Sequence, residues 1–285
     1  MRLEMPTTVA QALASLGEPG ARCIAGGQSL GAMMNADLVD PKVLVSLRCI
    51  DELRTIETKP SGTVRIGAMT TYSTIAGMSA TSGSMALIVQ AIPCIAHPQI
   101  RNQGTVGGSI CHADPAGDLP TLVTCIDAAL RIAHVGGQRE VLARDFFHGY
   151  FETALRPGEL LLSIDVPPAP VGVRAHYEKF MLTHGDFAAA SVAVLIGWDS
   201  RVCSFARVAV GACGPAPVCS VEVNDLLVRS TLDDETLHHA STLLLASCDP
   251  PDDFRGSRDF RMKLIPRLLR RAVLKAKASA EQSSA

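Results

Sequence analysis

The sequence has few aromatic residues and no excess of charge of either sign. Only 4% of its 285 residues are Phe, Trp or Tyr, and Trp198 is the single tryptophan. There are 26 Lys and Arg against 28 Asp and Glu, which gives a formal net charge of −2. Nucleic-acid binding needs a basic field and, for single strands, aromatic rings on which bases stack. The composition therefore argues against a nucleic-acid partner.

Long apolar runs are also missing. The longest, residues 188–196, is shorter than the roughly 18 residues that a membrane-spanning helix requires, so a buried strand is predicted there. The first six residues lack the apolar segment of a signal peptide. We therefore expect a cytoplasmic protein without a membrane span.

The nine cysteines are scattered and include no Cys-x-x-Cys pair. A cytosolic chain keeps its thiols reduced, and most buried thiols behave as small apolar side chains. Without clustered thiolates this chain is not expected to hold an iron–sulfur cluster by itself. Cys213 and Cys219, the closest pair, are interpreted as structural.

Hydrophobic residues make up 47% of the chain, which is enough for a sizeable core. Short strands alternate with helices up to the Pro-rich segment 167–172, which is the best domain boundary. After it, strand-like runs at 176–182, 189–198 and 204–211 predict a three-stranded antiparallel meander followed by helices. The last helix is expected over about 258–278, interrupted near Pro266. The predicted class is α+β.

Two Gly-Gly loops carry the clearest chemical signal. Residues 25–30, Ala-Gly-Gly-Gln-Ser-Leu, follow a predicted strand directly, and residues 105–109 read Thr-Val-Gly-Gly-Ser. Consecutive backbone N–H groups in such loops form a concave row of donors that suits a phosphate or diphosphate. Alone, the first loop is a weak signal, and a plain tight turn between strand and helix also explains it. Together they are much more specific, because two neutral donor loops can hold the two phosphates of a dinucleotide.

The segment 100–120 is dense in Gly, Asp, Asn and Pro and is predicted to be a long functional loop. It includes Cys111, His112, Asp114 and Asp118, a set that resembles part of a metal site. A zinc site needs a second ligand pair, which the sequence does not supply. Two other interpretations stay open: the Asp side chains cap turns and the next helix, or Asp118 binds the hydroxyls of a cofactor.

Four motifs, in this order and spacing, resemble a known family. They are residues 25–30, residues 66–71 (Ile-Gly-Ala-Met-Thr-Thr), residues 97–109 and residues 112–118 (His-Ala-Asp-Pro-Ala-Gly-Asp). The chain resembles, over essentially its whole length, the medium, FAD-binding subunit of molybdenum hydroxylases, the carbon monoxide dehydrogenase and xanthine dehydrogenase family. Residues 145–147, 157–162, 179–180 and 185–188 also fit the pattern.

The resemblance implies a bilobed FAD-binding domain of the vanillyl-alcohol-oxidase (PCMH) type, with lobe 1 at residues 1–57 and lobe 2 at 58–170. Residues 171–285 then form the family's small C-terminal α+β domain. By motif match, the FAD diphosphate is expected on backbone N–H groups of Cys23, Ile24, Ala25, Gly26, Gly27, Gln28, Ser29, Leu30, Thr105, Val106, Gly107, Gly108 and Ser109. Asp118, Leu161 and Lys179 match positions that contact FAD, and Ile95 matches an apolar position near the flavin ring.

The resemblance also defines the reaction and the partners. A large molybdopterin-binding subunit and a small subunit with two [2Fe-2S] clusters are expected to pass electrons to FAD on this chain. FAD would then pass them to an external acceptor, in a heterotrimer or a dimer of heterotrimers. No catalytic side chain and no metal ligand are expected in this chain. Gln28 occupies a position where some related sequences have His, so FAD is expected to bind noncovalently.

Two departures and three alternatives accompany this interpretation. Gly31-Ala32 replaces the Leu-Pro or Ile-Pro common after the first motif, and the cysteine-rich insertion of one related branch is absent. The alternatives are a self-contained flavin oxidase, a non-catalytic nucleotide-binding regulatory subunit and a metal-binding module. A self-contained oxidase needs a larger substrate domain than the residues after 170 provide.

Overall fold

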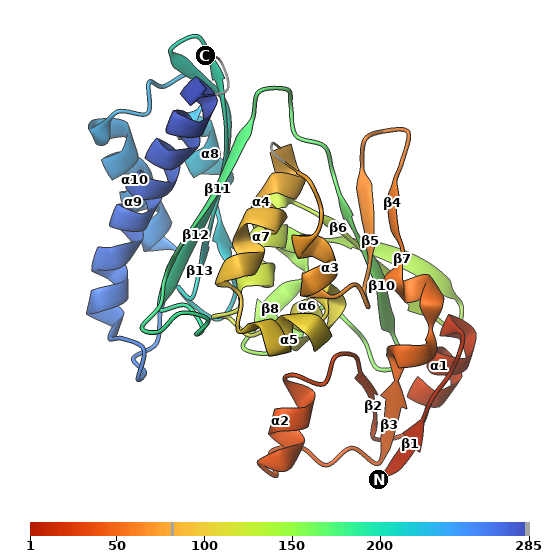
Figure 1. Ribbon diagram of the computed structural model, residues 1–285. Helices are drawn as coiled ribbons and strands as arrows, with labels where there is room; N and C mark the ends of the chain where they lie inside the picture. Colours follow the sequence, from red (N-terminus) through yellow and green to blue (C-terminus); the bar gives the residue numbers. More distant parts are fainter. Residues whose placement is uncertain (81–82, 283–285) are drawn as a thin grey trace.

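The protein is described by a computed structural model that covers residues 1–80 and 83–282 (Figure 1). Within these residues the strands form four sheets: one of three strands, one of five, one of four and a two-stranded hairpin. No helix in this part of the chain is both long and apolar enough to cross a membrane.

The N-terminal part is a three-stranded parallel sheet in the order β1-β3-β2. Its elements are β1 (Arg2–Glu4), α1 (Val9–Leu16), β2 (Ala21–Ile24), α2 (Leu30–Asn35) and β3 (Val43–Ser46). Thr8 caps α1, because its hydroxyl accepts a hydrogen bond from the Gln11 N–H at 3.2 Å. Strand β1 was not predicted, since its side chains are mostly exposed and give no apolar alternation.

A five-stranded antiparallel sheet in the order β4-β5-β10-β6-β7 forms the centre of the molecule (Figure 1). Its strands are β4 (Ile56–Thr58), β5 (Val64–Gly67), β6 (Ala129–His134), β7 (Gly137–Leu142) and β10 (Leu160–Val166), and β8 (Phe147–Gly149) and β9 (Glu152–Thr153) form the separate hairpin. The helices that accompany it are α3 (Tyr72–Ala76), α4 (Gly83–Ala91), α5 (Pro98–Gln103), α6 (Val106–His112) and α7 (Asp118–Ile126).

The prediction of a long loop over residues 100–120 was wrong, because α5, α6 and the start of α7 lie there. The glycines are needed for packing. A Cβ on Gly107 would lie 2.5 Å from the Ala68 Cβ, so only glycine lets α6 approach the end of β5 this closely. Tertiary contact therefore overrides a composition that is typical of loops.

The C-terminal part is an antiparallel sheet in the order β11-β12-β13-β14. The three predicted strands are present as β11 (Arg174–Phe180), β12 (Ala190–Asp199) and β13 (Val202–Gly211), and the short β14 (Val218–Cys219) adds a fourth. Helices α8 (Val221–Leu227), α9 (Asp234–Ala246) and α10 (Arg258–Gln282) complete it.

This sheet is buried on both faces. Along β12, Val192, Val194 and Ile196 face the core that includes α9 and α10. The alternate residues Ala193 and Leu195 face the core that contains α4 and α7. The sheet thus joins the C-terminal helices to the central part of the molecule (Figure 1).

Helix α10 runs unbroken through Pro266, so the predicted interruption was wrong. A proline inside a helix costs about 3 kcal/mol through its lost hydrogen bond and its ring clash. The neighbouring Ile265, Leu268 and Leu269 are almost fully buried. Burying each such side chain contributes about 1.5–3 kcal/mol, which outweighs the cost of the proline.

Candidate dinucleotide-binding site

The first Gly-Gly loop leaves β2 and turns into α2 against the centre of the molecule. A Cβ on Gly26 would lie 2.0 Å from the Gln103 carbonyl oxygen, so this backbone touches the end of α5 directly. Gly27 has a φ of +73°, a left-handed conformation that favours glycine. Each glycine is therefore required by the path of the loop.

This loop presents a row of open donors. Among the described residues, the five consecutive backbone N–H groups from Gly26 to Leu30 donate to no acceptor of the chain. The carbonyl groups of the loop are used instead: Gly26 O accepts from Gln28 Nε2 at 2.9 Å, and Gly27 O accepts from Gly31 N at 3.0 Å. Since the loop is only partly buried, the donors are open to an anionic ligand.

The second Gly-Gly segment forms the N-cap and first turn of α6, and its backbone N–H groups from Val106 to Ser109 are occupied. Val106 N donates to Thr70 O at 3.0 Å, and Gly107 N donates to Ala68 O at 2.8 Å. The N–H groups of Gly108 and Ser109 are bonded to the Thr105 hydroxyl and carbonyl. Donation to a diphosphate from this segment would require these bonds to be exchanged. The Gly26–Leu30 donors need no such exchange.

The two Gly-Gly segments lie against each other. A Cβ on Gly108 would lie 3.5 Å from the Ala25 Cβ, which is ordinary van der Waals contact. Thr70, whose carbonyl binds the first N–H of α6, has a buried hydroxyl without a partner among the described residues. A buried hydroxyl without a partner calls for an acceptor or donor from outside the chain.

Asp118 is the first residue of α7, and it is buried. Each of its carboxylate oxygens accepts a hydrogen bond from a buried side chain. Tyr177 donates its hydroxyl to Asp118 Oδ1 at 2.5 Å, and Lys179 Nζ donates to Asp118 Oδ2 at 3.0 Å. Lys179 also donates to the Cys94 carbonyl at 3.0 Å. Burial raises the pKa of Asp118, while the nearby Lys179 and Tyr177 act to lower it. Burial likewise raises the pKa of Tyr177 well above its ordinary value, so that phenol is a donor.

Ile95 and Leu161 are buried in one apolar core, which also contains Val106 of α6. Ile95 follows directly after Cys94, whose carbonyl binds Lys179. Cys23, at the end of β2, keeps its proton because burial raises the pKa of its thiol to about 12. The structure therefore brings Ile95 near the Asp118–Lys179 pair, while Cys23 and Ile24 belong to the strand that delivers the donor loop.

Tyr177 and Cys94 were missed at the sequence level. Tyr177 alternates with Lys179 along β11, so both side chains lie on the same face of the strand. The strand pattern at 176–182 could have shown this pairing, but nothing in the sequence placed Asp118 opposite it.

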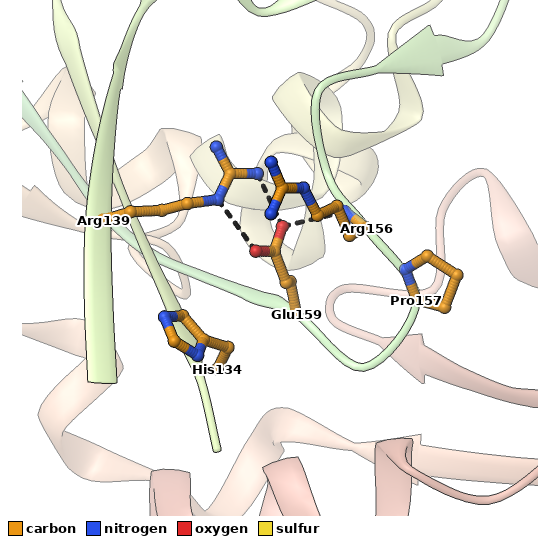
Figure 2. Close-up of a pocket in the computed structure, with 5 residues that line it drawn as sticks. All are labelled: His134, Arg139, Arg156, Pro157 and Glu159. Atoms are coloured by element: carbon orange, nitrogen blue, oxygen red, sulfur yellow. Dashed lines mark hydrogen bonds and ion pairs between the residues drawn. The ribbon is translucent and has the colours of Figure 1, made fainter. Parts of the chain in front are cut away.

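A separate cavity of about 230 Å³ lies at the ends of β6 and β7, and Figure 2 shows the five residues that line it. Arg139 holds the Glu159 carboxylate with two hydrogen bonds, Nε to Oε1 at 2.8 Å and Nη2 to Oε2 at 2.6 Å. The Arg156 N–H donates to the same carboxylate at 2.8 Å. Because the Arg139 guanidinium and the Glu159 carboxylate are already paired, we interpret the lining of this cavity as structural.

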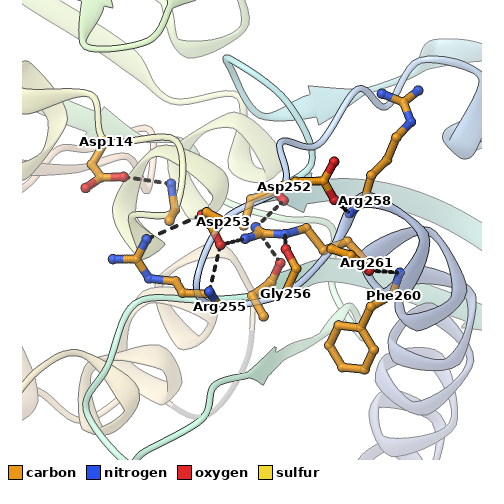
Figure 3. A network of polar contacts seen from close by, with 12 residues as sticks. Asp114, Asp252, Asp253, Arg255, Gly256, Arg258, Phe260 and Arg261 are labelled. Atoms are coloured by element: carbon orange, nitrogen blue, oxygen red, sulfur yellow. Dashed lines mark hydrogen bonds and ion pairs between the residues drawn. The ribbon is translucent and has the colours of Figure 1, made fainter.

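Arg261 of α10 fixes the loops that lead into β12 and α10 (Figure 3). It is 1% exposed and donates to the carbonyls of Ala189 at 2.9 Å and Ala212 at 3.3 Å, and it also pairs with Asp253. Ala212 in turn donates to Pro115 O at 3.0 Å. The segment before Asp118 is thereby attached to the C-terminal domain.

In the part of the chain described, no group of three His, Cys, Asp or Glu could hold a metal ion.

Comparison with known proteins gives matches over almost the whole chain. Residues 1–169 match the family described as the FAD binding domain in molybdopterin dehydrogenase, and residues 175–276 match the CO dehydrogenase flavoprotein C-terminal domain. The carbon monoxide dehydrogenase medium chain of Afipia carboxidovorans is 37% identical over 97% of this chain and 96% of its own.

Two further relatives agree. The 6-hydroxypseudooxynicotine dehydrogenase complex subunit alpha of Paenarthrobacter nicotinovorans is 32% identical over 94% of this chain and 92% of its own. A chain of reconstituted CO dehydrogenase from Oligotropha carboxidovorans superposes with a TM-score of 0.95 at 36% identity, covering 98% of both chains.

Proposed function

The chain belongs to the FAD-binding subunits of molybdenum hydroxylases, the carbon monoxide and xanthine dehydrogenase family, and we propose that its Gly26–Leu30 backbone binds the diphosphate of FAD. It is an oxidoreductase subunit. The molybdenum cofactor and the iron–sulfur clusters belong to a large and a small partner subunit, and this chain carries the flavin step. The match spans 96% of the Afipia carboxidovorans medium chain, which favours a flavin subunit over a self-contained oxidase.

The single observation that carries the diphosphate assignment is the open donor row. Five successive N–H groups have no acceptor among the described residues, and they belong to a partly buried loop whose glycines set its path. Neutral N–H donors bind an anionic diphosphate without the desolvation penalty of a buried cation. The α6 segment, Thr105–Ser109, would contribute its close contact with Ala25 and the Thr105 and Ser109 hydroxyl groups.

Other residues are assigned to the remainder of the cofactor. The paired Asp118 and Lys179 are suited to its hydroxyl and polar ring atoms, and Ile95 and Leu161 supply apolar surface. FAD supplies the chemistry, because it exchanges electrons singly or in pairs. The chain binds, orients and shields it. Gln28 uses its side-chain amide on the Gly26 carbonyl and offers no nucleophile, which supports noncovalent binding.

The domain boundaries and the cellular location of the protein are part of the same proposal. We assign lobe 1 to residues 1–57, lobe 2 to 58–170 and the C-terminal domain to 171–285; the two family matches, which end at 169 and begin at 175, support the second boundary. A cytoplasmic location is supported by the nine cysteines, which are all free thiols.

Competition binding tests the diphosphate assignment. FAD, ADP and riboflavin are titrated into the cofactor-free chain. ADP should displace FAD, because it carries the diphosphate, and riboflavin should compete far less. The Gly26→Ala variant should lose at least tenfold in FAD affinity, since its Cβ would lie 2.0 Å from Gln103 O.

Gly77→Ala is the matched control, because its Cβ would lie at an ordinary 3.5 Å from Thr74 O. It should bind FAD like the wild type. Wild-type affinity in Gly26→Ala, or failure of ADP to compete, would refute the assignment of the diphosphate to this loop.

A further inference from the structure

A buried chain of polar groups crosses from the C-terminal sheet to the start of α7. The Tyr177 hydroxyl contacts the Ser191 hydroxyl on the neighbouring strand and donates to Asp118 at 2.5 Å. Asp118 then pairs with Lys179 at 3.0 Å. All four residues are buried or nearly so, and the Lys179 side chain is only 1% exposed. Tyr177 therefore links two strands of one domain to a carboxylate of another.

Lys179 has more N–H donors than it has hydrogen-bond acceptors among the residues that the structure describes. Its ammonium group has three N–H donors. Two of them have acceptors, Asp118 Oδ2 and the Cys94 carbonyl, both at 3.0 Å. No third acceptor is present among the described residues, although the side chain is buried. A buried, charged donor without an acceptor indicates that a ligand completes the set.

We propose that Tyr177 is a positioning residue of the FAD site, which fixes the Asp118 carboxylate so that Lys179 keeps one N–H available to the bound cofactor. This inference rests on the proposed function. Tyr177 acts through Asp118, and no contact between Tyr177 and the cofactor is implied. The role assigned to it is electrostatic: it decides how strongly Asp118 holds the Lys179 ammonium group.

The physical reason lies in how the carboxylate shares its charge. The short hydrogen bond from Tyr177 occupies Oδ1 and spreads the negative charge away from Oδ2. Without that bond, Asp118 draws the ammonium group closer, away from the Cys94 carbonyl, and cancels more of its charge. A fixed cation favours the more negatively charged, reduced form of a bound cofactor. Loss of the Tyr177 hydroxyl should therefore weaken binding of reduced FAD more than binding of oxidised FAD.

The test is the midpoint potential of FAD bound to the full chain, measured in the wild type and in Tyr177→Phe. The ratio of affinities for reduced and oxidised FAD should fall about tenfold, which equals a midpoint about 30 mV more negative for a two-electron couple. In an Asp118→Asn background the same Tyr177→Phe change should have no further effect, because the hydroxyl acts through the carboxylate.

Two control variants separate this effect from general destabilisation. Ser241→Ala removes another buried hydroxyl, which donates to Leu237 O at 2.7 Å in α9, and Tyr150→Phe removes an exposed phenol. Both should keep the wild-type potential. A Tyr177→Phe potential equal to that of the wild type, or an equal shift in the Asp118→Asn background, would overturn the inference. A wild-type chain that binds no FAD would instead overturn the proposed function.

Discussion

Gly211, at the end of β13, lies against Thr121 of α7 so closely that a Cβ on it would sit 2.0 Å from the Thr121 hydroxyl oxygen. The same Cβ would lie 2.6 Å from the Ser191 hydroxyl oxygen. This contact sets how near α7 lies to the C-terminal sheet. It therefore determines whether Asp118, in the first turn of α7, reaches Tyr177 and Lys179.

The Gly211→Ala variant should be less stable and should bind FAD more weakly. Overpacking of this kind typically destabilises by about 1–3 kcal/mol. Urea unfolding and FAD titration measure the two effects. Gly214→Ala is the control, since its Cβ would meet Asp249 N at an ordinary 3.6 Å, and it should behave like the wild type. An unchanged FAD affinity in Gly211→Ala would show that the contact between Gly211 and α7 does not position the FAD site.

Gly27→Val should abolish FAD retention, because a β-branched side chain is strained at the φ of +73° that the donor loop requires. Gly62 has a φ of +83° in the turn between β4 and β5, so Gly62→Val introduces a comparable strain away from the proposed site. Flavin retained after gel filtration distinguishes the two variants. Equal flavin loss in both would mean that strain alone, rather than the loop, explains the result.

Acid should destabilise the protein through Glu159 and Asp165. The hydrogen bond from Arg139 lowers the pKa of Glu159 below its ordinary value of 4.5. Burial acts to raise the pKa of Asp165, but the hydrogen bonds from Arg65 and Lys59 lower it below 3.8 overall. Native pKa values below the unfolded ones give stability that is present above the unfolded values. It is lost as pH falls through the native values.

The thermal midpoint should therefore fall steeply below about pH 4.5, the ordinary value for Glu159. Glu159→Gln should be less stable at neutral pH and should show a shallower decline in acid. Thermal unfolding followed by circular dichroism across the acid range measures both slopes. Parallel curves for variant and wild type would contradict the role given to the Arg139–Glu159 pair.

Arg261→Met should destabilise the C-terminal domain by about 3 kcal/mol, near the lower end for breaking a buried ion pair. The substitution leaves the Ala189 and Ala212 carbonyls without their donor. Arg261→Lys should rescue it only in part, because one ammonium group lacks the fork of donors that reaches both carbonyls. Arg270→Met, which removes an exposed pair with Asp234 on the same helix, should unfold at nearly the wild-type urea concentration.

The sequence predicted the C-terminal strands well, because long alternating apolar runs such as 189–198 leave few choices. It singled out the two Gly-Gly segments, but it predicted neither their contact with each other nor that the second would form the first turn of a helix. That difference depends on Ala68 and Thr70, which lie far away in sequence and accept the α6 N–H groups. Pro266 shows the same limit, since burial against the sheet decides whether the helix continues.

The Asp118 cluster was predictable only in part. Asp118 and Lys179 were expected from the family resemblance, whereas Tyr177 required the registers of β11 and α7 to be known together. A hydrogen bond between residues 59 positions apart leaves no local pattern in the sequence. Composition and periodicity describe single elements, and this cluster exists only where two of them meet.

The flavin content of the purified full-length chain, before and after acid precipitation, tests the central claim most directly. About one FAD per chain should remain through gel filtration, and acid should release it into the supernatant, because Gln28 offers no covalent link. A purified, folded chain that carries no flavin and takes up none when FAD is added, or flavin that stays with the precipitated protein, would contradict noncovalent binding of FAD by this subunit.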